Sequence, residues 1–424
     1  MATYRRRVID TEIDELMTGV AALAINGPRA TGKTATASAR AATTYALDDP
    51  RTRSIIDADP GRIVTGPPPI LIDEWQRMPA SWDMVRRAVD ADRTPGRFLL
   101  TGSASPRVPP THTGAGRIVS LRMRPMTLME RGVEIPSVSL AGLMTGDPSA
   151  LTGTTDVTAD RYANEILASG FPGLRDLPDR VVRAELDSYI SQVINVDIVE
   201  AGSSVRKAAA LRRWLQAYAA GVSSTTSYEK IRDAASVGRV EKPARSTALR
   251  YLDALESLWL IEPVPGWIST ANDLARLTAS PKHQLVDPAL AGRLRRVTMD
   301  TLIKGQAAGP LAPRHTTLFG ALFESLVTLD VRVYAQAAEA SVFHFRDFGG
   351  EHEVDLIVEG PDQRVLAIEV KLAAVVGSDD GRHLRWLRDR LGDRMLDAVI
   401  VTTGREAYRR ADGIAVVPAA LLGP

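Results

Sequence analysis

Three short apolar runs in the first hundred residues predict buried strands. Each run ends in a turn or in polar residues, and a helical pattern from Lys33 to about Tyr45 follows the first of them. Strands that alternate with helices predict a parallel sheet, whose ligands bind at the carboxyl ends of the strands. The runs are residues 20–26, Pro69–Ile72, which leads into Asp73-Glu74, and Arg97–Leu100, which leads into Thr101-Gly102-Ser103.

The middle of the chain, from about 160 to 256, has a mainly helical spacing of apolar residues. Within Arg245–Ile261 these residues lie three or four apart, which predicts an amphipathic helix. A short strand and Pro263 come next. A helix followed by a short strand in this way resembles a winged helix-turn-helix.

From about residue 316 the pattern changes again and predicts an α/β unit with mixed strands. A helix over 319–330 precedes two apolar runs, EVDLIVE and VLAIEVKL, and a second helix near 381–391 precedes two more strands. The stretch at 145–158 is rich in Gly, Ser and Thr, which is typical of a linker. We therefore expect three domains, over residues 1–158, 159–300 and 301–424.

Composition narrows the class of protein. The chain has 424 residues, 45% hydrophobic and 24% charged, which is typical of a soluble globular protein with several domains. Lys plus Arg (52) nearly balance Asp plus Glu (51), so any surface that binds nucleic acid has to be local. The chain has no cysteine, which excludes disulfides and thiolate metal sites. Without a signal peptide or a run of ~20 apolar residues, we expect a cytoplasmic protein with no membrane partner.

The first apolar run leads into Gly27-Pro28-Arg29-Ala30-Thr31-Gly32-Lys33-Thr34, which matches the P-loop pattern G-x-x-x-x-G-K-[ST] in full. The glycines allow backbone N–H groups to surround phosphates. We expect Lys33 to reach the β- and γ-phosphates of ATP, and the Thr34 hydroxyl to bind Mg²⁺. A chance glycine-rich turn is the alternative, and the strand before the motif and the helix after it argue against that.

Asp73 and Glu74 end the second apolar run. An acidic residue at the end of a buried strand is poorly solvated unless it meets a cation. We expect Asp73 to hold the Mg²⁺ and Glu74 to polarise the attacking water. The alternative is an ordinary strand end that carries two acids.

Further polar residues are candidates for sensing or stabilising the phosphates. Thr101 and Ser103 end the third run, where a hydroxyl could sense the γ-phosphate or position a water, unless the two simply mark a turn. Arg29, inside the P-loop, and Arg117 are candidate charge stabilisers. An arginine from a neighbouring subunit of a homo-oligomer could serve instead.

Basic residues surround the expected recognition helix and also precede it. A winged helix on DNA needs such residues to meet phosphates. Short basic runs are also typical of solvated helix faces, and winged helices serve as protein-contact modules as well. The first group is Arg239, Lys242, Arg245 and Arg250, and the second is Arg206, Lys207, Arg212 and Arg213.

Carboxylates gather in the last part of the chain. Glu369 and Lys371 lie two apart in VLAIEVKL, so they face the same side of a strand. Asp355 lies in EVDLIVE, on the expected neighbouring strand of a hairpin, and Glu324 lies on the preceding helix. Such a set binds Mg²⁺ and directs a water at a phosphodiester, so we expect catalysis by these four residues, with Asp355 and Glu369 as metal ligands. The alternative is an exposed strand face with a Glu–Lys pair and unrelated acids.

Together these motifs resemble the bacterial and archaeal AAA-type ATP-binding proteins that join a P-loop ATPase domain to an uncharacterised C-terminal domain. The resemblance implies that Lys33, Thr34, Asp73 and Glu74 are the ATPase residues and that the middle contains a winged helix. The Ala30-Thr31 pair is less glycine-rich than in some relatives. The motifs that carry the resemblance span nearly the whole chain, and they are INGPRATGKT, LIDEWQRMP, FLLTGSASP, GRIVSLRMRPMTLME, SGFP, YLDALESLWLIEP, LVDPALAG, FGALFESL and EVDLIVE…AIEVKL.

The same resemblance implies a C-terminal fold similar to the PD-(D/E)xK nucleases, whose motif residues correspond to Glu324, Asp355, Glu369 and Lys371. We therefore expect Mg²⁺-dependent ATP binding and hydrolysis, coupled to DNA binding or processing. The alternative is an ATP-controlled protein-interaction module whose nuclease-like domain is not catalytic, which the near-zero net charge favours. A P-loop kinase is a third possibility, although Glu74 favours water as the phosphate acceptor.

Overall fold

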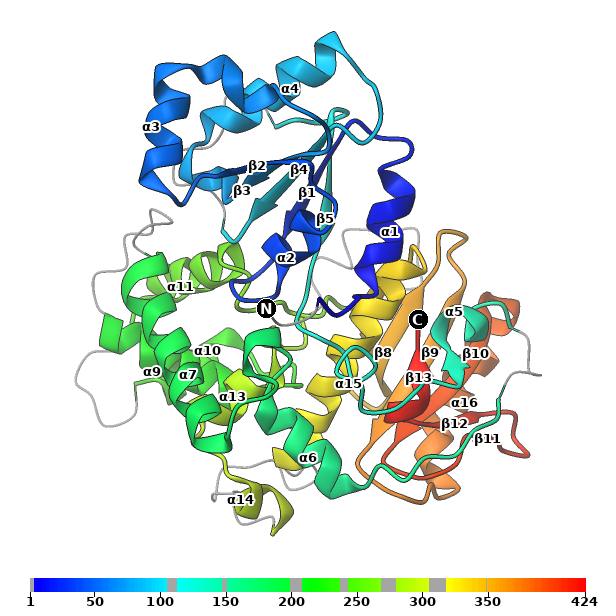
Figure 1. The fold of residues 1–424 in the computed structure, drawn as a ribbon. Coiled ribbons are helices and arrows are strands. Elements are labelled where there is room, and N and C mark those ends of the chain that lie inside the picture. Colours follow the sequence, from blue (N-terminus) through cyan, green and yellow to red (C-terminus); the bar gives the residue numbers. More distant parts are fainter. Residues whose placement is uncertain are drawn as a thin grey trace.

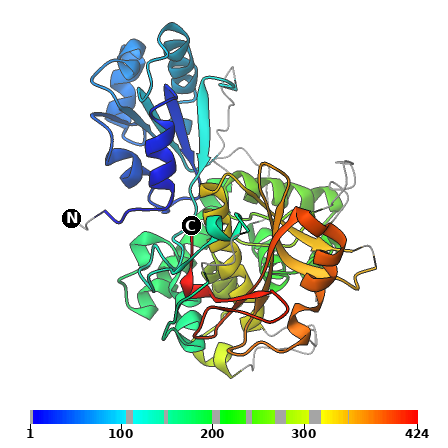
Figure 2. The same ribbon diagram turned by 90° about the vertical axis from the view of Figure 1, so that its right-hand side faces the viewer.

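The computed structural model describes residues 4–104, 113–146, 151–198, 208–236, 243–267, 280–304, 318–347 and 349–424. An N-terminal α/β region lies beside a helical middle region and a C-terminal α/β region (Figure 1, Figure 2). The long helix α15 (Leu318–Ala337) runs between the last two. Within the ranges given, no helix combines the length and the apolar character that crossing a membrane requires.

The N-terminal region is a parallel sheet with helices on both faces, as the sequence predicts. The strand order is β2-β3-β4-β1-β5, and every neighbouring pair is parallel. One apolar cluster packs α3 and α4 against one face, and another packs α1 and α2 against the other. The strands are β1 Ala22–Asn26, β2 Thr43–Ala46, β3 Ile70–Asp73, β4 Phe98–Gly102 and β5 Ile118–Arg122, and the helices are α1 Ile9–Leu16, α2 Lys33–Ser38, α3 Pro50–Ala58 and α4 Ala80–Ala91.

The helix after the P-loop is shorter than the sequence pattern predicts. Helix α2 ends at Ser38, and the residues expected to complete it instead form strand β2 at the edge of the sheet. Thr43 and Tyr45 are paired in parallel with Ile70 and Ile72 of β3. Because β-branched and aromatic side chains fit an edge strand better than a helix interior, pairing with β3 overrides the helical spacing.

The middle region is helical, in agreement with its apolar period. Thr158 caps the first helix by accepting a hydrogen bond from the Arg161 amide, and Asp287 caps α13 in the same way, with Pro288 at its first position. The helices are α6 Ala159–Ala168, α7 Asp179–Gln192 with a π-helical turn Val193–Asp197, α9 Ala208–Ala220, α10 Tyr228–Ala234, α11 Arg245–Ser257, α13 Pro288–Leu294 and α14 Met299–Ile303.

The chain after α11 forms short extended pairings that join the middle and C-terminal regions. Ile261 is bridged to Leu285 and Val264 to Lys282, both antiparallel, and Gly266 is bridged to His344. We call residues 261–267 and 281–285 the linking ladder. The short strand expected after the helix is therefore present as extended pairing, and it continues onto strand β7 of the C-terminal sheet. The winged helix itself stays a prediction.

The C-terminal region is a six-stranded mixed sheet, as its alternating runs predict. Strand β8 pairs antiparallel with β7 and β9, whereas β10 pairs in parallel with β9 and β12. Helix α15 packs on one face and α16 (Arg382–Leu391) on the other. The strand order is β11-β12-β10-β9-β8-β7, and the strands are β7 Ser341–Arg346, β8 Glu353–Glu359, β9 Val365–Lys371, β10 Met395–Thr402, β11 Tyr408–Arg409 and β12 Ala415–Pro418.

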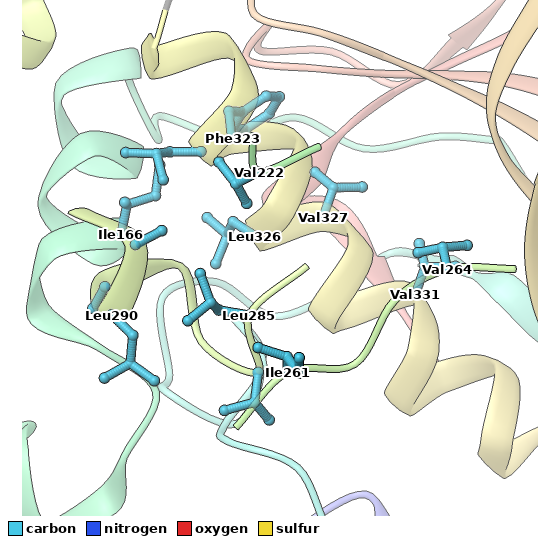
Figure 3. Packing of buried hydrophobic residues seen from close by; sticks show 14 of the residues in the cluster. Ile166, Val222, Ile261, Val264, Leu285, Leu290, Phe323, Leu326, Val327 and Val331 are labelled. Atoms are coloured by element: carbon cyan, nitrogen blue, oxygen red, sulfur yellow. The ribbon is translucent and has the colours of Figure 1, made fainter. Parts of the chain in front are cut away.

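The middle and C-terminal regions share one hydrophobic core, organised around α15. Side chains of α15, including Phe323 and Leu326, lie close to Ile166 of α6 and to Ile261 and Leu285 of the linking ladder (Figure 3). Helix α15 is longer than the 319–330 predicted from the sequence, because residues packed beneath it from both regions extend its buried length.

The segment that follows the N-terminal sheet runs along the C-terminal region. Strand β6 (Val138–Ser139) pairs with β13 (Leu422–Gly423), helix α5 (Leu140–Leu143) follows, and Thr154 is bridged to Glu406. Of the stretch expected to be a linker, residues 147–150 lie outside the described ranges. This segment thus contacts the far end of the chain, which its composition did not indicate.

Candidate functional site

The P-loop connects the end of β1 to the start of α2 at the carboxyl edge of the N-terminal sheet. A Cβ atom at Gly27 would lie 2.2 Å from the Met123 carbonyl oxygen, so only glycine fits there. Gly32 has a φ of +97°, and Ala30 also takes a left-handed φ of +64°. A non-glycine residue in this region costs about 1 kcal/mol, so the loop holds a backbone shape that its local sequence does not favour at position 30.

Lys33 folds back over the loop that it follows. Its ammonium donates hydrogen bonds to the carbonyl oxygens of Gly27, at 3.0 Å, and Pro28, at 2.8 Å, and the residue is 5% exposed. Burial lowers the Lys33 pKa to about 8. The Glu74 charge acts to raise this pKa, and the Arg122 charge acts to lower it further. The lysine is therefore held by neutral acceptors, which a polyphosphate can replace.

Asp73 meets two hydroxyl groups at the end of β3. The Thr34 hydroxyl donates to Asp73 Oδ1 at 2.8 Å, and the Thr101 hydroxyl donates to the same oxygen. Asp73 is 7% exposed. A buried carboxylate beside a threonine hydroxyl supplies the oxygen ligands that Mg²⁺ prefers, with waters and phosphates completing its shell. These residues therefore fit a magnesium ion.

Glu74 is fixed in place by the neighbouring strand. It has a φ of +55°, and its backbone N–H donates to the Thr101 hydroxyl at 3.2 Å. The Ser103 hydroxyl donates to Glu74 Oε2 at 2.9 Å, and the Gln76 amide donates to the same oxygen. Thr101 and Ser103 are thus more than turn residues, since each holds one of the two acids. Gln76 was not predicted from the sequence, and its place two residues after Glu74 was the available signal.

The two arginines expected as charge stabilisers lie in different places. Arg117 precedes the first residue of β5, at the opposite edge of the parallel sheet from the P-loop, and pairs with Asp90 at 2.8 Å. It therefore does not reach the P-loop of its own chain, which corrects that expectation. Arg29 remains on the P-loop and pairs with Asp197 of the middle region at 2.7 Å.

Arg122 is an arginine beside the P-loop that no motif in the sequence indicates. It ends β5 in register with Asn26, the residue before Gly27. Its guanidinium lies 3.8 Å from the Trp259 ring centroid and 3.7 Å from a carboxylate oxygen of Glu262. Among the described residues, none of its three guanidinium nitrogens has a hydrogen-bond partner. Burial lowers its pKa to about 10, and the residue lines a cavity of about 630 Å³.

The four C-terminal residues expected to act together do lie together. Asp355 Oδ2 accepts a hydrogen bond from the Val370 amide at 2.9 Å, which joins β8 to β9 beside Glu369. The Lys371 ammonium donates to Glu369 Oε1 at 2.8 Å, so these two side chains point the same way. Glu324, on α15, reaches the same cluster, because one ammonium, that of Lys282, donates hydrogen bonds to both Glu324 and Asp355.

A fifth residue, Lys282, lies between Glu324 and Asp355 of this cluster. Its ammonium lies 2.9 Å from Glu324 Oε1 and 2.9 Å from Asp355 Oδ1. Burial raises the pKa of Glu324 to about 8 and that of Glu369 to about 8. Burial alone would lower the pKa of Lys282, but the nearby carboxylates, Asp355 first among them, raise it well above its ordinary value. Within the described ranges, no group of three or more His, Asp or Glu residues is arranged to hold a metal ion.

The predicted basic surface is only partly described. Four of its residues, Arg206, Lys207, Arg239 and Lys242, lie outside the described ranges. Arg212 donates to the Ser191 hydroxyl at 3.2 Å, and Arg213 has a buried Nε. Arg245 and Arg250 are exposed on α11.

Three segments of the chain match known protein families. Residues 20–131 match the AAA domain family, residues 159–301 match the domain of unknown function DUF8612, and residues 319–422 match the domain of unknown function DUF4143. The first match contains the P-loop together with Asp73 and Glu74. The N-terminal region is thus similar to AAA domains, with the P-loop inside the matched residues.

Relatives over most of the chain are uncharacterised proteins. One from Mycobacterium bovis and one from Mycobacterium tuberculosis are each 26% identical over 410 residues, covering 93% of this chain and 79% of theirs. A Walker-type ATPase of Pyrococcus abyssi aligns in structure with a TM-score of 0.38 and 14% identity, over 68% of this chain and 94% of that one. None of these matches names a nuclease or a winged helix.

Proposed function

We propose that this chain binds ATP with Mg²⁺ at the P-loop and hydrolyses it. The observation that carries the proposal is the meeting of Thr34 and Asp73, whose oxygens lie 2.8 Å apart at the carboxyl edge of a parallel sheet. Mg²⁺ takes one or two such protein ligands and bridges to phosphate oxygens. The match of residues 20–131 to the AAA domain family supports the same chemistry.

The residues around this point divide the proposed reaction among them. Lys33 exchanges the Gly27 and Pro28 carbonyls for phosphate oxygens, which hold its charge more strongly. Glu74 orients the attacking water through a carboxylate that Ser103 keeps in place. Arg122, whose guanidinium nitrogens have no hydrogen-bond partner among the described residues, offers its charge from the neighbouring strand to the charge that develops on the phosphates.

The test compares Glu74→Gln with the wild type. The amide keeps the size of the side chain but orients and deprotonates water poorly, so turnover should fall by about 100-fold or more while ATP affinity changes less than about threefold. Phosphate release measures turnover, and a fluorescent ATP analogue measures binding. Glu229→Gln, at an exposed position of α10, is the matched control and should resemble the wild type. If the wild-type chain binds no ATP, the proposal of ATP binding and hydrolysis is wrong.

We further propose that this ATP hydrolysis is coupled to the binding or processing of DNA. Arg245 and Arg250, exposed on α11, support contact with phosphates. ATP turnover with linear, supercoiled and single-stranded DNA, each at two salt concentrations, tests the link. We expect one form of DNA to stimulate ATP turnover, and this stimulation to weaken as the salt concentration rises. An ATP turnover that no form of DNA changes would contradict the proposed link.

A second candidate is an ATP-controlled protein-interaction module whose C-terminal region is not catalytic. Lys282 favours it, because an ammonium between Glu324 and Asp355 fills the place of the metal that phosphodiester cleavage uses. This candidate predicts intact plasmid and single-stranded DNA after incubation with Mg²⁺ or Mn²⁺, and ATP-dependent retention of a protein partner. DNA cleavage that disappears in Lys371→Ala would rule it out.

A further inference from the structure

The carboxylate cluster of the C-terminal region already contains a cation, and the cation belongs to the middle region. The Lys282 ammonium lies 2.9 Å from Glu324, 2.9 Å from Asp355 and 3.6 Å from Glu353. Its side chain is 1% exposed. Several carboxylates around one buried point are the ligands of a hard divalent cation. The ammonium therefore lies among side chains of the kind that bind such an ion, while in this arrangement no group of three or more His, Asp or Glu residues in the described ranges is set to hold one.

A buried carboxylate oxygen shows that the ammonium fills the cluster incompletely. Glu369 Oε2 has no hydrogen-bond partner in the described part of the chain, although Glu369 Oε1 accepts from Lys371 at 2.8 Å. Glu369 is 5% exposed. Its pKa is raised chiefly by burial, and the nearby Asp355 charge is the second cause. A buried acceptor without a partner is costly. A cation between Glu369 and Asp355 would satisfy it, and Lys282 contacts only Asp355 of the two.

Lys282 reaches the cluster because of the linking ladder. The backbone groups of Lys282 and Val264 exchange two hydrogen bonds of 2.8 Å. In the same ladder, the Glu262 amide donates to the Gln284 carbonyl at 3.0 Å, and the Glu262 carboxylate pairs with Arg124 of the N-terminal region at 2.7 Å. Ion pairs therefore anchor the ladder at both ends, and its backbone hydrogen bonds hold the main chain of Lys282 beside the cluster.

We propose that Lys282 is an internal plug: its ammonium replaces a divalent metal ion among Glu324, Asp355 and Glu369, and excludes metal while the linking ladder is docked. The Lys282 ammonium carries one positive charge, whereas a divalent metal ion carries two, and this difference explains why Glu369 Oε2 lacks a partner. Docking of the ladder and metal binding then exclude one another, because both need the same two carboxylates. The inference goes beyond ATP hydrolysis and does not depend on it.

Mn²⁺ binding to the full-length, nucleotide-free chain tests the plug, with free Mn²⁺ followed by electron paramagnetic resonance. Lys282→Met removes the charge and nearly keeps the side-chain volume. We expect Lys282→Met to gain one Mn²⁺ per chain, with a Kd at least tenfold below that of any wild-type site. The double variant Lys282→Met/Asp355→Asn should lose this ion again. Lys304→Met, at the exposed lysine that directly follows α14, is the control and should bind as the wild type does.

Two results would overturn the plug. A folded Lys282→Met chain, shown by cooperative unfolding, that binds no more Mn²⁺ than the wild type is the first. The second needs no change at Lys282: a wild-type Mn²⁺ site that disappears in Asp355→Asn would mean that the lysine does not exclude metal. If Lys282→Met does not fold, Lys282→Gln, which also removes the charge, takes its place, and a gain of one Mn²⁺ per chain supports the plug whereas no gain refutes it.

Discussion

The P-loop and the C-terminal cluster each bring a lysine and carboxylates into one buried place, but they hold the lysine differently. Lys33 lies six residues from Gly27 and rests on two neutral carbonyls, while hydroxyls hold Asp73. Lys282 comes from 42 residues before Glu324 and 73 residues before Asp355, and pairs with both directly. A hydrogen bond to a carbonyl is easily exchanged, whereas a buried ion pair is hard to break. The first lysine is free to meet a ligand, and the second is occupied by its own chain.

The largest effect is expected from removing the second lysine. Lys282→Met should lower the free energy of unfolding by about 3–5 kcal/mol, because it leaves buried carboxylates without their cation. The pKa of Glu324, already raised to about 8, rises further without the ammonium. A carboxyl whose folded pKa exceeds its unfolded value stabilises the fold at low pH and loses that contribution as pH rises. The loss should therefore be greater at pH 8 than at pH 5.

Urea unfolding of the wild type and of Lys282→Met at the two pH values measures this difference. Lys304→Met is the matched control and should change the free energy of unfolding by less than about 0.5 kcal/mol. If Lys282→Met lowers the free energy of unfolding by less than about 1 kcal/mol, or if the loss grows toward acid pH, then Lys282 is held no more tightly than Lys33.

The second effect is a pH dependence that belongs to the P-loop. The Lys33 pKa is lowered to about 8, so above pH 8 the nucleotide-free lysine is neutral and has to take up a proton when a polyphosphate binds. ATP affinity should therefore fall as pH rises from 8 to 10, by up to about tenfold per pH unit.

Calorimetry in buffers with different ionisation enthalpies should detect the proton that binds with ATP. Lys33→Met should bind ATP weakly at every pH and take up no proton at this site. Wild-type binding that is constant from pH 8 to 10 would mean that Lys33 keeps its charge in the nucleotide-free chain.

The smallest effect concerns the residues that position Glu74. Ser103→Ala removes one hydrogen bond to the carboxylate, so turnover should fall by about tenfold at nearly unchanged ATP affinity. Arg117→Gln is the matched control, because Arg117 lies at the opposite edge of the sheet and pairs with Asp90. Equal losses in the two variants, measured by phosphate release, would contradict a specific role for Ser103.

Much of the fold followed from local pattern, and the exceptions have physical causes. The apolar runs predicted β1, β3 and β4, because central strands of a parallel sheet are buried on both faces. Strand β2 was missed, since its half-exposed pattern reads as a helix until β3 is there to pair with it. Likewise, the full length of α15 depends on the two regions that pack against it.

By itself, the sequence determined the P-loop, the acids after β3 and the shared face of Glu369 and Lys371, because each depends on residues close together along one loop or one strand. Only the tertiary structure decided which cations meet them. The register of β5 puts Arg122 beside the P-loop and Arg117 at the far edge, and the linking ladder carries Lys282 into the carboxylate cluster. Charges act through space over a few ångströms, so their partners are chosen by how distant segments pack, which local spacing does not record.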